Sequence, residues 1–284
     1  MSLDKRKLEE KFFKVLMITS TVLIVGILLS VLVVVLFKGA PALSVSMLTQ
    51  TPKGGYYLGK EGGILNAIVG SLYLAGGATV IAFIVSLPTA LYLNEYAGKS
   101  KLASFTRQSL DILWSVPSII YGVFGFTLMI YFGVRASLLG GIMALALLEL
   151  PIMIRAMDEV MRMVPLKLKE ASYALGATKL ETTLNVIVRQ ALPGVLMAIL
   201  LAIGRAIGDA ASVLFTAGYS DNIPGSLFDP VASLPLAVFF QLGTPFLEVQ
   251  QRAYASGFIL LVIVLSLSIT SRLLAKRSMR YVIK

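Results

Sequence analysis

The stretch PLKLKEASYALGATKLETTLNVIVRQALPG, residues 165–194, decides the architecture that we expect for this chain. Pro165 suits the first turn of a helix, and good helix formers follow it until Gly176, which suits the left-handed residue after a helix end. Thr178 and Glu181 then have the spacing of a capping box, so a second helix should begin there. The stretch predicts a helix, a glycine turn and a second helix.

Around this stretch the chain is far more apolar than a soluble domain. Of its 284 residues 57% are hydrophobic and 14% are charged, whereas a soluble domain has about 25% charged residues. Several uninterrupted or nearly uninterrupted apolar runs exceed the length of about 20 helical residues that crosses a hydrocarbon core. These runs predict an all-α polytopic membrane protein with six transmembrane helices, at residues 15–37, 62–94, 112–134, 136–154, 191–218 and 253–271.

A further apolar run, residues 230–247, contains Pro230, Pro235 and Pro245. Proline at this density breaks a spanning helix, because proline lacks the backbone N–H and clashes with the preceding turn. We therefore expect a re-entrant or interfacial segment on the outer side, within residues 219–252. A seventh crossing is the alternative, and it would put the C-terminus outside.

The distribution of basic residues predicts the orientation. If both termini are cytoplasmic, most of the 25 lysine and arginine residues fall on the cytoplasmic side, as the positive-inside rule requires. The net charge of +10 then belongs to a rim that faces anionic headgroups, and nucleic-acid binding is not expected. The basic residues left for the outer side are Lys38, Lys53, Lys60, Arg135 and Arg252.

This topology divides the chain into three parts. Residues 1–62 hold the cytoplasmic N-terminus, the first crossing and an outer loop. Residues 63–275 form a five-helix core, which includes a large cytoplasmic loop at 155–191 and the outer segment at 219–252. Residues 276–284 form a cytoplasmic tail.

The side-chain inventory restricts the chemistry. The sequence has neither cysteine nor histidine, so it can form no disulfide and no thiolate or imidazole metal site. Residues 54–61, GGYYLGKE, imitate a phosphate-binding loop, but the Ser or Thr that such a loop uses for Mg²⁺ is replaced by Glu61. A glycine-rich turn is the favoured interpretation. We expect no bound cofactor in this chain and no ATP hydrolysis by it.

Apolar side chains crowd the bend of the cytoplasmic hairpin, where a loop should be solvated. A short amphipathic helix of this kind can enter a groove in another protein. It can also lie on the headgroups or pack on its own spans, and helix periodicity leaves these alternatives even. The side chains are Ala171, Tyr173, Ala174, Leu175 and Leu180.

Two opposite charges, Arg205 and Asp209, interrupt the fifth apolar run. A charge at the bilayer centre costs about 3 kcal/mol on insertion scales, so such groups face the bundle interior or a water-filled path. Their i, i+4 spacing predicts one helix face, and Gly204 and Gly208 would let another helix approach beside them. A substrate pathway and a structural bridge both fit this pattern.

Smaller expectations concern single residues near the cytoplasmic side. Glu149, beside Pro151, is expected to pair with Arg155 in a structural role. Pro88 and Pro117 are expected to kink the second and third crossings.

The cytoplasmic hairpin resembles the EAA loop of the membrane subunits of bacterial ABC importers. The likeness rests on Glu170-Ala171-Ser172, then three residues and Gly176, and an apolar stretch that ends in Leu192-Pro193; alanine is usual at the position of Ser172. In that family the loop forms the coupling helices that dock into the ATP-binding subunit. The resemblance therefore implies a docking role for Glu170, Ala171, Ser172, Tyr173, Leu175, Gly176 and Ala177.

Further stretches resemble one branch of that superfamily, the permease of the phosphate-specific importer, of the PstA type. They are GGILNAIVGSLYL at 62–74, LPTALYLNEYA at 87–97, VPSIIYGVFGF at 116–126 and GRAIGDAASVLFTAG at 204–218. The resemblance implies a MetI-like permease fold in a bacterial inner membrane. An importer of another oxyanion and, less favoured, a secondary transporter remain as alternatives.

The resemblance also implies partners and a role for the charged pair. The partners would be a second permease of the PstC type, two ATP-binding subunits that hold ATP and Mg²⁺, and an external phosphate-binding protein. Arg205 would pair transiently with phosphate, because a guanidinium binds phosphate oxygens in a bidentate way. Asp209, where the family usually has glutamate, would compete with phosphate for Arg205. This competition would shorten the time for which the anion stays bound.

Overall fold

The computed structural model describes residues 3–53, 62–98 and 100–278, so the glycine-rich residues 54–61 and most of the tail lie outside it. Within these ranges, five helices are long and apolar enough to cross a membrane, or six if a bent pair counts as one crossing. In chain order the elements are α1 (Leu3–Ala42), α2 (Val45–Thr49), α3 (Leu65–Leu91), the π-helical turn η1 (Tyr92–Tyr96), α4 (Lys101–Ser115), α5 (Ser118–Tyr131), α6 (Leu138–Arg162), α7 (Leu166–Ala174), α8 (Lys179–Thr182), the π-helical turn η2 (Thr183–Ile187), α9 (Val188–Ile207), α10 (Leu234–Leu242) and α11 (Leu247–Ser278).

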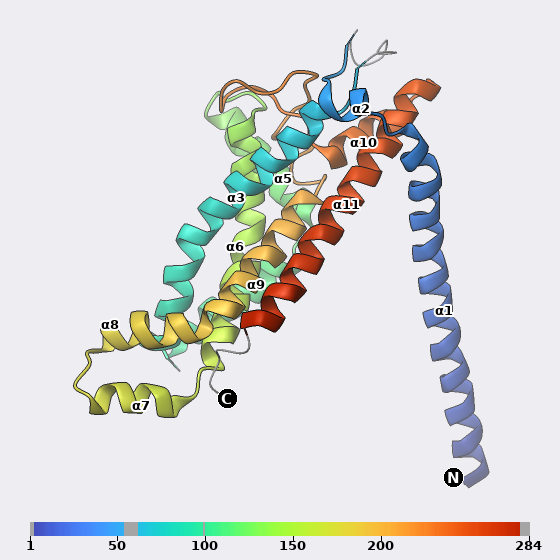
Figure 1. Ribbon diagram of the computed structural model, residues 1–284. Coiled ribbons are helices and arrows are strands. Elements are labelled where there is room, and N and C mark those ends of the chain that lie inside the picture. Colours follow the sequence, from blue (N-terminus) through green and yellow to red (C-terminus); the bar gives the residue numbers. More distant parts are fainter. Residues whose placement is uncertain (1–2, 54–61, 99, 279–284) are drawn as a thin grey trace.

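The core lies where α3 packs along α6, with α9 and α11 beside them (Figure 1). Small residues on α3 allow this close approach, since Ala75, Ala78 and Ala82 are all buried. Leu74 of α3 and Leu145 of α6 fill the space between the helices and are almost completely buried. This packing of small against large side chains supports the helices that carry the site.

Helix α1 stands apart from the bundle over most of its length (Figure 1). It packs on α11 at its C-terminal end, where Gly39 lies against the backbone of Tyr254. A Cβ added at Gly39 would lie 2.6 Å from the carbonyl oxygen of Tyr254. Lys38 also lies over the ring of Tyr254, with Nζ 4.9 Å from the ring centroid. The glycine therefore sets the close approach of these two helices.

The third predicted crossing, residues 112–134, is not one straight helix. Helix α4 ends at Ser115 and α5 begins at Ser118, and the two meet at an angle of 97°. Pro117 lies at the corner, and Val116 before it is extended, with ψ 130°, as a residue before proline prefers. The kink expected at Pro117 is confirmed. The predicted run therefore consists of α5 and the last turn of α4, and the bent pair of helices makes up the sixth candidate crossing.

The fifth predicted crossing, residues 191–218, ends earlier than expected. Helix α9 stops at Ile207, so Asp209 lies beyond the helix that carries Arg205. The Oδ2 atom of Asp209 accepts hydrogen bonds from the backbone N–H and the hydroxyl of Ser212, at 2.8 and 2.5 Å. This local turn competes with helical hydrogen bonding. The prediction that Arg205 and Asp209 share a helix face is therefore wrong.

The proline-rich run 230–247 forms the nine-residue helix α10, which is too short to cross a membrane. The prediction that this run is not a crossing is confirmed. The backbone N–H of Leu234 donates to Ser71 Oγ of α3 at 2.8 Å. Gly70 lies under the same segment, and a Cβ added there would lie 1.9 Å from the carbonyl oxygen of Ala232. The segment is thus fastened to the N-terminal half of α3.

Both ends of the described chain lie toward one end of the molecule. Figure 1 shows the first turns of α1 and the last turns of α11 toward the end that carries α7 and α8. The segment before α3 and the loop before α10 lie at the opposite end. The arrangement agrees with a topology in which both termini share the side of the hairpin.

Candidate functional site

The helical hairpin predicted from residues 165–194 is present. Helix α7 begins directly after Pro165, and Gly176 has the left-handed φ of +86° that the turn requires. Thr178 and Glu181 form the predicted capping box, in which the Thr178 N–H donates to Glu181 Oε2 at 2.8 Å and the Glu181 N–H donates to Thr178 Oγ1 at 3.3 Å. The expected helix, turn and helix are confirmed.

Helix α7 presents an exposed apolar tip. The side chain of Leu175 is 89% exposed and that of Tyr173 is 43% exposed. No residue of α7 is buried, and Glu170, Ala171 and Gly176 are exposed as well. An exposed leucine and tyrosine beside a glycine turn form a small projection that suits a groove on another protein.

The inner face of the hairpin is closed by polar contacts. Ser172 Oγ of α7 lies 2.9 Å from Thr182 Oγ1 of α8, and both Ser172 and Ala177 are partly covered. The hydroxyl at the position where the family motif usually has alanine therefore has a structural partner. This contact holds α7 against the start of the second helix.

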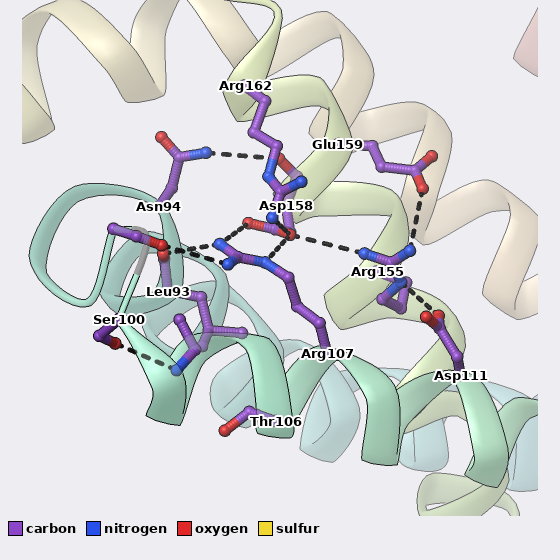
Figure 2. Close-up of polar contacts among 12 residues, drawn as sticks. Leu93, Asn94, Ser100, Thr106, Arg107, Asp111, Arg155, Asp158, Glu159 and Arg162 are labelled. Atoms are coloured by element: carbon purple, nitrogen blue, oxygen red, sulfur yellow. Dashed lines mark hydrogen bonds and ion pairs between the residues drawn. The ribbon is translucent and has the colours of Figure 1, made fainter.

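A buried ion cluster lies at the base of the hairpin, at the end of α6 (Figure 2). The Asp158 side chain is fully buried, and Arg107 of α4 binds both of its oxygens, with Nε 2.9 Å from Oδ2 and Nη2 3.2 Å from Oδ1. Arg162 Nη2 lies 3.1 Å from Asp158 Oδ2, and Arg155 Nη1 lies 3.7 Å from it. One carboxylate thus ties α4 to α6.

The cluster replaces the pairing that we expected for Glu149. Arg155 binds Asp111 of α4 at 2.6 Å, whereas Glu149 is fully buried and accepts a hydrogen bond from Thr79 Oγ1 at 3.3 Å. The prediction of a pair between Glu149 and Arg155 is wrong. The two are six residues apart, so their side chains point about 120° apart around the helix axis and face different neighbours.

Sequence reasoning missed the Asp158 cluster, although part of its signal was present. Arg155, Asp158 and Arg162 follow one another at helical spacing, which predicts mutual contacts on one face. Arg107 comes from another helix about fifty residues earlier, and no local pattern links it to Asp158. Arg252, which was expected on the outer side, lies near the start of α11 and is only 3% exposed.

Arg205 and Asp209 face different surroundings. The side chain of Arg205 is 51% exposed on α9, that of Asp209 is 5% exposed, and Nη2 lies 3.9 Å from Oδ1. Arg205 lines a groove of about 420 Å³ between α9 and α11, together with Ser268 and Arg272. The pair is therefore loose, and the guanidinium is free to meet another group.

Asp209 instead points toward the interior. It borders an internal void of about 10 Å³ that Ser71 and Ser233 also line. A void of this size holds one water molecule at most. The structure brings Asp209 together with Ser212 and the α10 segment, and it brings Arg205 together with α11.

Comparison with known proteins identifies the family. Residues 86–280 match the family described as binding-protein-dependent transport system inner membrane component. The chain is 36% identical over 244 residues to the phosphate transport system permease protein PstA of Haemophilus influenzae, covering 86% of this chain and 85% of that protein. The chain belongs to the PstA family of permeases. A Yersinia pestis PstA is 37% identical over 84% of this chain and 80% of that protein.

Comparison with solved structures identifies the fold of this PstA-family chain. It superposes on the MetNI methionine ABC transporter in an inward-facing conformation with a TM-score of 0.60 and 18% identity, covering 76% of this chain and 95% of that chain. An amino acid ABC transporter gives a TM-score of 0.58 at 18% identity, covering 75% and 93%. The PstA-family chain therefore has the MetI-like permease fold and is a multi-pass membrane protein. Its family consists of transport permeases rather than enzymes.

Proposed function

We propose that this chain is one permease subunit of an ABC importer that carries inorganic phosphate across a bacterial inner membrane. The printed names of its PstA relatives support phosphate as the substrate. The chain would form half of the translocation pathway, and a second permease of the PstC type would form the other half. An external phosphate-binding protein would deliver the anion.

The exposed tip of α7 is the observation that carries this proposal. Leu175 and Tyr173 would enter a groove on an ATP-binding subunit, and Glu170, Ala171, Ser172, Gly176 and Ala177 would complete the contact. Two such subunits would hold ATP and Mg²⁺, since this chain contributes no phosphate-binding loop for them. Closure of the ATP-binding pair would then move α7.

The orientation follows from the same contact. ATP-binding subunits work in the cytoplasm, so α7 and α8 would face the cytoplasm. The ends of α1 and α11 that lie toward the same end of the molecule would also be cytoplasmic (Figure 1). Lysine and arginine near these ends support this choice.

Arg205 would provide a cationic site in the pathway at which phosphate binds transiently. Its guanidinium is half exposed beside a groove, and its nearest acid is 3.9 Å away. A phosphate oxygen could therefore displace a weak contact rather than break a tight ion pair. Asp209 would compete with the anion for the guanidinium, which shortens the time for which the anion stays bound.

Docking can be tested by charge placed on the tip of α7. We expect Ala171→Glu and Leu175→Glu to weaken co-purification with the ATP-binding subunits by about tenfold or more, since loss of a central interface contact costs about 2 kcal/mol. Gln108→Glu, at an exposed site on α4, adds the same charge outside the tip of α7 and serves as the control. Normal co-purification of both α7 variants would overturn the docking role.

The substrate and the role of Arg205 are tested in the complete complex with its binding protein. Phosphate, and not sulfate or molybdate, should stimulate ATP turnover and be taken up. Arg205→Gln should reduce uptake while the complex still assembles, and Arg205→Lys should retain part of it. Stimulation by another oxyanion would reassign the substrate, and unchanged uptake by both variants would remove Arg205 from the pathway.

A further inference from the structure

Helix α7 is fastened to the end of α3 as well as to its own neighbours in the chain. Lys169 Nζ of α7 lies 2.5 Å from Glu95 Oε1 of η1. The Lys169 side chain is 16% exposed and that of Glu95 is 6% exposed, so water screens this ion pair only weakly. An ion pair held away from water resists separation, unlike most pairs on a surface.

A second contact joins the hairpin to the same turn. Lys179 Nζ, at the start of α8, lies 4.6 Å from the ring centroid of Tyr96, and that ring stacks on Tyr92. The two lysines, one from each arm of the hairpin, thus both contact residues of η1. The end of α3 is therefore a partner of the hairpin.

Arg107 of α4 also binds the same turn (Figure 2). Its Nη2 donates to the carbonyl oxygen of Leu93 at 2.8 Å, and its Nη1 donates to that of Gly98 at 3.2 Å. The same guanidinium binds Asp158 of α6 through Nε. The contacts therefore run without a gap from α7 through η1 to α4 and α6.

The turn at the centre of this chain of contacts is π-helical. The N–H of Ala97 donates to the carbonyl oxygen of Tyr92 at 2.8 Å, one residue further back than in an α-helix. Single π-helical turns occur frequently at functional sites, and they mark places where a helix changes its register or direction. The hairpin therefore contacts α3 at the turn where the helix changes its register.

We infer that the ion pair between Lys169 and Glu95 transmits the movement of α7 to the bundle. The inference rests on the proposed function, because the movement would come from the ATP-binding subunits. In this scheme α7, η1 and the cytoplasmic ends of α4 and α6 move as one body. Lys169 and Glu95 are positioning residues, and neither touches the substrate.

The first test separates transmission from assembly. In the assembled complex, Lys169→Gln and Glu95→Gln should keep ATP hydrolysis but lower the phosphate imported per ATP by about tenfold, within the usual range of coupling between sites. Lys167→Gln removes a charge from the same helix at an exposed position and should behave as the wild type. Normal import per ATP in both pair variants would overturn the inference.

Exchange of the two charges supplies the second test. The double variant Glu95→Lys with Lys169→Glu restores an ion pair, so it should recover coupling that both single reversals lose. A merely structural role would restore thermal stability without restoring import per ATP. A double variant that is as uncoupled as the single reversals, although it assembles, would contradict transmission through this pair.

A third measurement needs no phosphate, so it distinguishes failure of this inference from failure of the proposed substrate. The chain has no cysteine, which allows spin labels at Lys167→Cys on α7 and Ser104→Cys on α4. The distance between the labels should stay constant when ATP binds to the complex, and Glu95→Gln should make it change. A distance that changes with ATP in the otherwise unaltered chain would show that the two helices do not move together.

Discussion

Arg107 of α4 and Asp158 of α6 form a two-point contact in which Nε and Nη2 donate to the two carboxylate oxygens, at 2.9 and 3.2 Å. The geometry fixes both the distance and the rotation of one helix against the other. Because Asp158 is fully buried, it cannot exchange this partner for water. The last part of α6, which leads toward α7, is therefore held firmly against α4.

Loss of Asp158 should destabilise the protein strongly. We expect Asp158→Ala to lower the free energy of unfolding by about 3–5 kcal/mol, because it leaves several arginines without their shared buried partner. Asp111→Ala removes an acid from the same cluster whose side chain is 51% exposed, and it should cost about 1 kcal/mol or less. Thermal unfolding in detergent measures both variants, and equal losses would contradict this view of the cluster.

Gly70 should tolerate no side chain. A methyl group there would meet the carbonyl oxygen of Ala232, so Gly70→Ala should displace the α10 segment and cost about 1–3 kcal/mol. Gly76→Ala lies on the same helix with no atom within 4 Å of the added carbon, and it should be neutral or slightly stabilising. Thermal unfolding measures the stability of both variants. If Gly70→Ala leaves the stability unchanged, the α10 segment can move away from α3 at little cost.

Substitutions of Arg205 and Asp209 should have different effects on the stability of the protein. Asp209→Ala removes the acceptor of two buried hydrogen bonds from Ser212, and it should cost about 1–3 kcal/mol. Arg205→Ala removes a half-exposed side chain with one loose contact, and it should leave the melting temperature nearly unchanged. If Arg205→Ala is the more damaging variant, Arg205 has a structural role rather than the proposed pathway role.

The capping box should respond to acid. The backbone N–H and the hydroxyl of Thr178 lower the pKa of Glu181 below its ordinary value of 4.5. A lowered pKa in the folded state means that the stabilisation is present above pH 4.5 and is lost as the pH falls through the lowered value. Hydrogen exchange at α8 should therefore accelerate in that window beyond its intrinsic pH dependence. Glu181→Gln should abolish the extra change, and an unaltered profile would contradict this assignment.

Local chemistry allowed the hairpin to be predicted residue by residue. Proline at the start, glycine in the turn and the Thr178–Glu181 spacing each act within one helical turn, so no knowledge of distant segments is needed. The same holds for the proline-rich run that does not cross the membrane. Apolar run length likewise placed the long helices α1, α3, α6, α9 and α11.

Contacts between distant segments account for what could not be predicted. The end of α9 depends on the bond from Ser212 to Asp209, which a hydrophobic run conceals because its apolar residues continue past the helix end. The partners of Asp158 and Lys169 come from helices far away in the chain. Helical periodicity gives the face of a residue on its own helix but does not identify the helix opposite.

The right-angle corner between α4 and α5 gives the molecule a built-in optical probe. The only tryptophan of the sequence, Trp114, lies in the last turn of α4 beside that corner, and its side chain is 51% exposed. Its fluorescence therefore reports on a single known spot, without labelling and without a background from other indoles. Quenchers placed at graded depths in the bilayer would measure the depth of the corner in the isolated, reconstituted chain.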